Sequence, residues 1–308
     1  MTKCNFGEFL LTFLIYSLGN ASVYAQVISP SQIKPDTQWK ETCERVAESV
    51  VKITHTKGGG TGVVIAKLDD EYVAITNLHV LHKDVNSYQI SLPFVCQTND
   101  PCTAEASLLG SKYPMQGNKS PLTDKVVDNW DLALIHFRSP VDIPVLQFEQ
   151  NWEPSQSVMA VGYTKDSPEI SILYQQGLLC LNPVLVSYIL PRPMLGGYQI
   201  GFKGSVEWGM SGGPLVSVKG NIVGINGRTV PLFGIPIHLY RFSSDKTFVH
   251  THLAQLYDLP EEIVLEKINR SSWAIHQSMV ADYIRSQLPT FQNLLSPKMY
   301  TPTYINLN

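Results

Sequence analysis

The sequence predicts an all-β core followed by a helical C-terminal extension. Short runs rich in β-branched and aromatic residues recur over residues 48–245, and Gly, Pro, Asn or Asp separates them. Short strands at such frequent intervals, without helices between them, are typical of a sandwich or a barrel. Residues 246–308 change to helical spacing, with apolar positions at Ile275, Met279, Tyr283 and Leu288. With 308 residues, 44% of them apolar, the chain is long enough for two units with buried cores.

A break over residues 140–154 divides the predicted strands into two consecutive all-β units, residues 48–142 and 143–245. Residues 26–47 are expected to form a linker that ends in a short helix. The predicted strands are Val50–Thr54, Gly62–Ala66, Tyr72–Thr76, Gln89–Leu92, Leu132–Phe137, Val158–Gly162, Ile172–Gln176, Tyr198–Phe202, Leu215–Val218 and Ile222–Ile225.

Residues 1–25 have the pattern of a secretory signal peptide. An apolar run extends from Phe9 to Leu18, and Val23 and Ala25 suit a signal peptidase site. The run has about ten residues, too few to span a bilayer, which needs roughly 20; an uncleaved anchor is the alternative. We therefore expect an exported chain, periplasmic or secreted, that starts at Gln26 and leaves the membrane after cleavage.

Cysteine usage agrees with export. Removal of the signal peptide leaves four cysteines, an even number that permits three pairings. Cys96 and Cys102 flank a short turn, which favours a bridge between them and leaves Cys43 to pair with Cys180. A zinc site is the alternative, but the sequence has no paired C-x₂-C spacing.

Composition argues against several classes of partner. The formal net charge is −3, and no basic stretch marks a nucleic-acid or membrane-surface site. Nothing in the sequence requires a cofactor or a metal. His79 and His82 can be read as a metal pair, but no third ligand is evident.

The sharpest chemical signal is GMSGGPL at residues 209–215. A nucleophilic serine must project its hydroxyl from a tight turn while backbone N–H groups point at the substrate carbonyl oxygen. Glycines on both sides of Ser211 permit that close approach. Taken alone, a Gly-rich turn before a strand is common.

Two further motifs supply a histidine and a carboxylate. AITNLHV at residues 74–80 is a strand that ends in a Thr-Asn turn and presents His79, a candidate acceptor of the serine proton. NWDLALI at residues 129–135 places Asp131 directly before an apolar strand, where a carboxylate can orient a histidine. Taken singly, each has a structural reading as a core histidine or a turn aspartate. Asp128 is the rival carboxylate, but it does not abut the strand.

Together the three motifs resemble the trypsin-like serine peptidases, which use His, Asp and Ser in this order. The resemblance covers about residues 48–240. Its detail is most similar to the HtrA/Deg-type branch and to small cyanobacterial trypsin-like peptidases, because GGTGVVI at 59–65 and VGINGR at 223–228 also match. It implies two antiparallel six-stranded β-barrels, the first with His79 and Asp131 and the second with Ser211, and a polypeptide substrate.

The resemblance also implies the parts that surround the nucleophile. The backbone N–H groups of Gly209 and Ser211 would form an oxyanion hole. A small, uncharged base of the substrate pocket argues against a demand for Lys or Arg. The implied pocket residues are Ser205 at the base and Val206, Asn226, Gly227 and Arg228 in the walls.

The chain departs from this family in two ways. Digestive relatives carry Asp just before the nucleophile, where it pairs with a new N-terminus on activation; here that residue is Met210. We therefore expect a site that is formed constitutively or ordered by a substrate or partner. Many HtrA proteins carry a β-rich PDZ domain, whereas residues 246–308 have a helical pattern that offers a surface for a protein partner.

We predict an exported serine endopeptidase that works through an acyl-enzyme, with a role in protein quality control. The alternative is a non-catalytic peptide-binding or chaperone-like module on the same fold. An esterase or lipase is disfavoured because the G-x-S-x-G elbow with Ser before Asp before His is absent.

Overall fold

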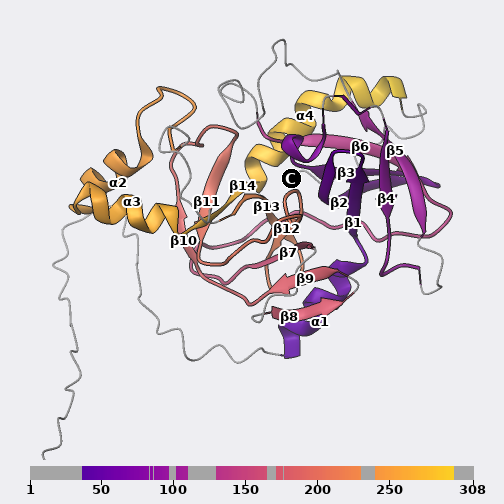
Figure 1. Cartoon of the computed structure of the whole chain (residues 1–308), viewed down its shortest axis with the longest axis horizontal. Coiled ribbons are helices and arrows are strands. Elements are labelled where there is room, and N and C mark those ends of the chain that lie inside the picture. The colour runs from indigo at the N-terminus through magenta and orange to yellow at the C-terminus, as the bar shows by residue number, and fades with distance from the viewer. Residues whose placement is uncertain are drawn as a thin grey trace, which may run out of the picture. The chain divides into compact units, whose positions relative to one another are not determined.

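A computed structural model describes residues 37–82, 84–85, 87–96, 102–109, 130–164, 171–175, 177–229 and 240–294 (Figure 1). The predicted signal peptide lies outside the described residues, as does the predicted linker up to residue 36. The predicted short helix is present as α1 (Thr37–Ala47).

Six antiparallel strands close a barrel in the order β1-β2-β3-β6-β5-β4, as predicted for the first unit. Its strands are β1 (Val50–His55), β2 (Gly58–Leu68), β3 (Glu71–Thr76), β4 (Tyr88–Ser91), β5 (Thr103–Leu109) and β6 (Ala133–Arg138). In the β3–β6 ladder Thr76 pairs with Ala133. The segment that follows β3 and the segment that precedes β6 therefore meet at one end of the barrel.

The second unit is an eight-stranded sheet that does not close, so the prediction of two six-stranded barrels is wrong for this half. Its order is β10-β11-β14-β13-β12-β7-β9-β8. Closure would need the two end strands, β8 and β10, to pair with each other, but in the described part of the chain β8 pairs with β9 and β10 pairs with β11. The strands are β7 (Met159–Tyr163), β8 (Ser171–Gln175), β9 (Leu178–Leu181), β10 (Val186–Ile189), β11 (Tyr198–Phe202), β12 (Pro214–Val216), β13 (Ile222–Arg228) and β14 (Ser272–His276).

Strand β14 lies within residues that the sequence predicted to be helical. Trp273, Ala274 and Ile275 are all fully buried, as expected of a strand placed between β11 and β13. A short run that is apolar on both faces fits strand and helix periodicity equally well. The sheet therefore takes a strand from the C-terminal extension.

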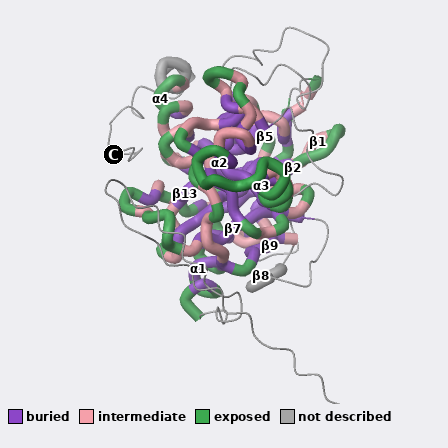
Figure 2. The backbone as a smooth tube through the Cα atoms, turned by 90° about the vertical axis from the view of Figure 1, so that its left-hand side faces the viewer, coloured by how far each residue is buried: buried purple, intermediate pink, exposed green. Residues whose placement is uncertain are grey.

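The rest of the described extension forms α2 (Val249–Tyr257), α3 (Glu261–Asn269) and α4 (Gln277–Leu294). Val280 and Ile284 of α4 are fully buried in the core that includes the second sheet. Of the predicted apolar stripe, Met279 and Tyr283 pack against this core and are partly buried, whereas Ile275 lies in β14 rather than in the helix. Helices α2 and α3 present much exposed surface (Figure 2). None of the described helices combines the length and the apolar character that a membrane crossing needs.

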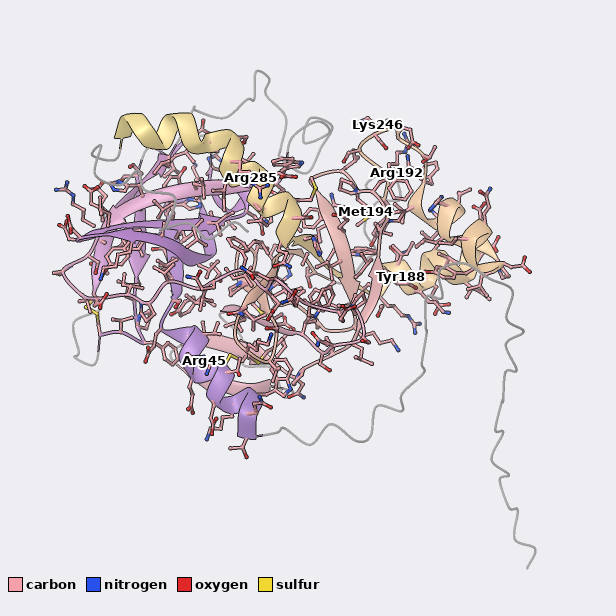
Figure 3. All side chains as sticks on the ribbon, turned by 180° about the vertical axis from the view of Figure 1, so that it is seen from behind. Arg45, Tyr188, Arg192, Met194, Lys246 and Arg285 are labelled. Atoms are coloured by element: carbon pink, nitrogen blue, oxygen red, sulfur yellow. A yellow bond between two sulfur atoms is a disulfide. The ribbon has the colours of Figure 1, made fainter. Side chains whose placement is uncertain are left out.

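Helix α1 joins the start of the barrel to the second sheet. The structure contains both predicted disulfides, and Cys43–Cys180 ties α1 to β9. Thr42 Oγ1 donates to Val218 O at 2.7 Å, and Arg45, labelled on α1 in Figure 3, donates to Lys219 O at 2.9 Å. These contacts fix α1 on the loop between β12 and β13.

Loss of the Cys43–Cys180 bridge should destabilise the fold more than loss of Cys96–Cys102. The two bridges span 137 and 6 residues, so the loop-closure contribution is about 5 kcal/mol against about 2 kcal/mol. Urea unfolding of the two Cys→Ser double variants, without reductant, measures both losses. Equal losses would show that chain entropy does not govern the effect.

Candidate active site

His79 lies in the short 3₁₀ helix η2 (Leu78–Val80), directly after β3. The last residue of β3, Thr76, donates its hydroxyl to Thr61 O of β2 at 2.6 Å. Next to it, Asn77 Nδ2 donates to Asp131 O at 2.8 Å. The Thr-Asn pair of the TNLH motif thus fixes the turn that carries His79.

Asp131 is 6% exposed, and each of its polar groups has a partner. Its N–H donates to Gly196 O at 2.8 Å, and its carbonyl accepts from Asn77. Oδ1 accepts the His79 N–H at 2.9 Å, and Oδ2 lies 2.6 Å from His79 Nδ1. Oδ2 also accepts the hydroxyl of Tyr198. A carboxylate with three donors is suited to remain ionised although it is buried.

Charge pairing outweighs burial at this pair. Burial alone would lower the pKa of His79, but the charge and the hydrogen bond of Asp131 raise that pKa above its ordinary value of 6.5, against a smaller opposing effect of Arg228. Burial would likewise raise the pKa of Asp131, yet His79 and Tyr198 bring it below its ordinary value. The geometry favours an ionised Asp131 whose partner His79 is a stronger base than a free imidazole.

Ser211 lies in the turn between β11 and β12, and its backbone is docked on the barrel. Thr61 N–H donates to Ser211 O at 2.9 Å. Gly212 has φ +86°, and a Cβ there would lie 2.1 Å from Thr61 O and 3.0 Å from Asn77 N. The loop that carries Ser211 therefore touches the turn that carries His79. The described contacts include no hydrogen bond between Ser211 Oγ and His79 Nε2, a contact that often tightens only when substrate binds.

The turn just before Ser211 leaves two backbone donors free. Met210 N–H donates to Glu207 O at 3.0 Å, and Gly209, at the third position, has φ +101°. This hydrogen bond with a positive-φ glycine is typical of a type II turn. Within the described part of the chain, the N–H groups of Gly209 and Ser211 donate to no protein acceptor, whereas that of Gly212 donates to Asn226 O at 2.8 Å.

Thr61 organises this turn, and sequence reasoning missed it. Its hydroxyl donates to Gly209 O at 2.7 Å and accepts the Tyr163 N–H at 2.8 Å. The side chain is fully buried. A lone hydroxyl residue among the glycines of GGTGVVI was the available signal. Tyr198 was also missed, because nothing near it in the sequence indicates its contact with Asp131.

The predicted pocket residues have varied environments. Ser205 is exposed, whereas Val206 is buried in the core of the second sheet. Asn226 is fully buried and donates to Pro214 O at 3.0 Å. The remaining two, Gly227 and Arg228, pack against Tyr198. No cluster of three or more His, Cys, Asp or Glu suited to a metal ion occurs among the described residues.

Comparison with known proteins places this geometry in a family. The family model of the trypsin-like peptidase domain matches residues 60–225, more than half of the chain. The chain belongs to the trypsin-like peptidase domain family. A peptidase domain is a hydrolase, the enzyme class that this family match indicates for the chain.

Two further comparisons identify proteins that are similar to this chain. Zebrafish (Danio rerio) serine protease HTRA1B is 25% identical over 210 residues, which are 60% of this chain and 39% of that protein. A crystal structure of the serine endoprotease from Yersinia pestis has 18% sequence identity and a TM-score of 0.49, over 83% of this chain and 68% of that one.

In this trypsin-like peptidase domain, the residue before the serine is anchored by apolar packing. Met210 is fully buried, in a core cluster with Val158 and Leu215. A Cβ at Gly162 of β7 would lie 2.8 Å from Met210 Cα, so the glycine allows this close approach. Burial of a Met side chain contributes about 1.5–3 kcal/mol. The turn is thus held from beneath by an uncharged side chain.

Neutralising Asp131 should move the pKa of His79 from above its ordinary value to below it. In the native protein the imidazole should titrate above 6.5; in Asp131→Asn the attraction is lost, and burial and Arg228 should bring the pKa below 6.5. NMR titration of the His79 ring signals measures both. Asp142→Asn, which removes a surface partner of Lys67, should leave His79 unchanged. An unchanged pKa in Asp131→Asn would contradict this account.

Proposed function

We propose that the protein is a serine endopeptidase that hydrolyses peptide bonds through Ser211, His79 and Asp131. The observation that carries this proposal is the partly buried His79–Asp131 hydrogen bond at 2.6 Å, next to a serine turn with two unused N–H donors. A binding module would have no need of a base oriented in this way. The family match supports the same reaction class.

In the proposed reaction, Ser211 Oγ attacks the carbonyl carbon of the scissile bond as His79 Nε2 takes the hydroxyl proton. Asp131 holds Nδ1–H and stabilises the imidazolium. The N–H groups of Gly209 and Ser211 bind the oxyanion. His79 then gives the proton to the leaving amine, and an ester remains on Ser211. Water, deprotonated by His79, hydrolyses that ester and restores the hydroxyl.

The substrates that fit this site are polypeptides, as the family implies. Trp208, beside Gly209 in the same turn, is 79% exposed and offers an aromatic surface where a substrate would approach. Ser205 remains the proposed base of the substrate pocket because its side chain is free of the core. Asn226 and Arg228 are occupied by internal contacts, which suits them to support a pocket wall.

We also propose that the chain is exported, and the two disulfides support this because such bridges persist in oxidising compartments. Bacterial expression of residues 1–308 should yield a chain outside the cytoplasm that begins at Gln26, as N-terminal sequencing would show. Leu11→Arg, which interrupts the apolar run, should hold the protein in the cytoplasm, whereas Thr12→Ser should not. An intact Met1 on native protein that stays in the cytoplasm would overturn export.

Ser211→Ala should abolish activity without loss of fold. Purified residues 26–308 should cleave unfolded casein and react with a fluorophosphonate probe, and the variant should do neither, with turnover lower by at least about 10³-fold. Ser278→Ala, an exposed serine of α4, is the matched control and should retain both. If the native protein neither cleaves casein nor reacts with the probe, the hypothesis of a peptide-binding module replaces that of a peptidase.

A further inference from the structure

Tyr198 supplies a buried hydroxyl to the carboxylate that orients His79. It is the first residue of β11 and is 1% exposed. Its hydroxyl donates to Asp131 Oδ2, the same oxygen that faces His79 Nδ1. Asp131 comes from the barrel and Tyr198 from the second sheet, so this contact joins the two sheets at the charged group.

Two glycines, Gly196 and Gly227, lie against the ring and hydroxyl of Tyr198. A Cβ at Gly227 would lie 2.3 Å from the Tyr198 hydroxyl, and a Cβ at Gly196 would lie 2.9 Å from its ring. Any side chain at either position would collide with the tyrosine. Both neighbours are therefore glycine where the tyrosine needs the space.

Arg228 also packs against the Tyr198 ring. Its guanidinium carbon lies 4.3 Å from the centre of the Tyr198 ring, a cation–π contact. Arg228 Nη2 donates to Leu195 O at 2.7 Å, and Gly196, the next residue, accepts the Asp131 N–H. Tyr198 and Asp131 are thus held by one connected set of contacts rather than by a single bond.

We propose that Tyr198 is a positioning residue for the proposed catalytic residues Ser211, His79 and Asp131. Its hydroxyl fixes the Asp131 carboxylate toward His79 and takes up part of the negative charge of that carboxylate. The expected effect of Tyr198 on the reaction rate rests on the proposed function. The expected effect on the pKa of His79 does not, because it depends only on the hydrogen-bonded pair His79 and Asp131.

The expected direction follows from the charges around the pair. Among the described residues, the titratable and charged groups that face the Asp131 carboxylate are His79 from η2 and Tyr198 from β11, and Arg228 from β13 acts on His79. Without the hydroxyl, the carboxylate keeps more of its charge for the imidazolium, so the pKa of His79 rises further. A base that must be neutral then works only at higher pH, and a less firmly held carboxylate slows the reaction.

The experiment compares Tyr198→Phe with Tyr72→Phe. Tyr72 is equally buried, and its hydroxyl donates to Val141 O at 3.1 Å, away from Asp131. The first readout is kcat/KM against pH on a peptide substrate. The second is NMR titration of His79 in a Ser211→Ala background, which needs no activity.

In Tyr198→Phe, the acid limb and the His79 midpoint should both move to higher pH by about half a unit or more. The plateau of kcat/KM should fall by about tenfold. Tyr72→Phe should leave both midpoints at the native value. Incorporation of 3-fluorotyrosine at position 198 strengthens the donor and should move the His79 midpoint to lower pH, a change of sign that a purely structural role cannot produce.

The positioning role would be overturned if Tyr198→Phe kept the native midpoints of the His79 titration and of the acid limb. It would also be overturned if fluorotyrosine moved the His79 midpoint in the same direction as Tyr198→Phe does. If the native protein is inactive but the two changes at position 198 still move the His79 midpoint in opposite directions, the peptidase proposal is refuted and the positioning role of Tyr198 is supported. If Tyr198→Phe does not fold, the fluorotyrosine protein, which keeps the hydroxyl, decides the question alone.

Discussion

A buried carboxylate is the constraint on which the site depends. An ion removed from water needs several donors, and removal of one partner from a buried ion pair typically costs about 3–5 kcal/mol. Asp131 obtains its donors from η2 in the barrel and from β11 in the second sheet. Both sheets must therefore meet at Asp131 in one relative position. The same requirement fixes the ring of His79, because two of the donors belong to that residue.

Contacts elsewhere also hold the two sheets together. Thr61 in the barrel holds the Gly209 carbonyl and the β7 backbone at once. On another part of the interface, α1 is tied to β9 by a disulfide. The segment between the two sheets is held by Glu149, a buried carboxylate that accepts from Ser217 Oγ at 2.8 Å and from Lys219 at 3.2 Å. The precise placement of Asp131 is thus supported from several directions, as a preorganised site requires.

Sequence patterns located the candidate residues that lie in short motifs and missed the contacts between residues far apart in the sequence. His79 follows a strand end, Asp131 precedes one, and the glycines beside Ser211 mark a turn, so short motifs were enough to find all three as candidates. Tyr198 meets Asp131 across 67 residues, and no spacing encodes such a contact. The strand β14 was missed because its apolar run fits two periodicities. The second sheet was predicted closed because the family resemblance implied a second six-stranded barrel, and the sequence pattern does not show which strand edges pair.

The two halves of the site differ in their dependence on charge. The turn that presents Gly209 and Ser211 is held by a threonine hydroxyl, a buried methionine and glycine contacts, none of which titrates in the ordinary pH range. The protonation of His79, by contrast, depends on Asp131 and Arg228, and that of Asp131 depends on His79 and the Tyr198 hydroxyl. We therefore expect a change in pH to alter the charge of His79 and to leave the geometry of the turn intact. Tyr198 acts on the half that responds, which is why substitution there should change a titration rather than the shape of the site.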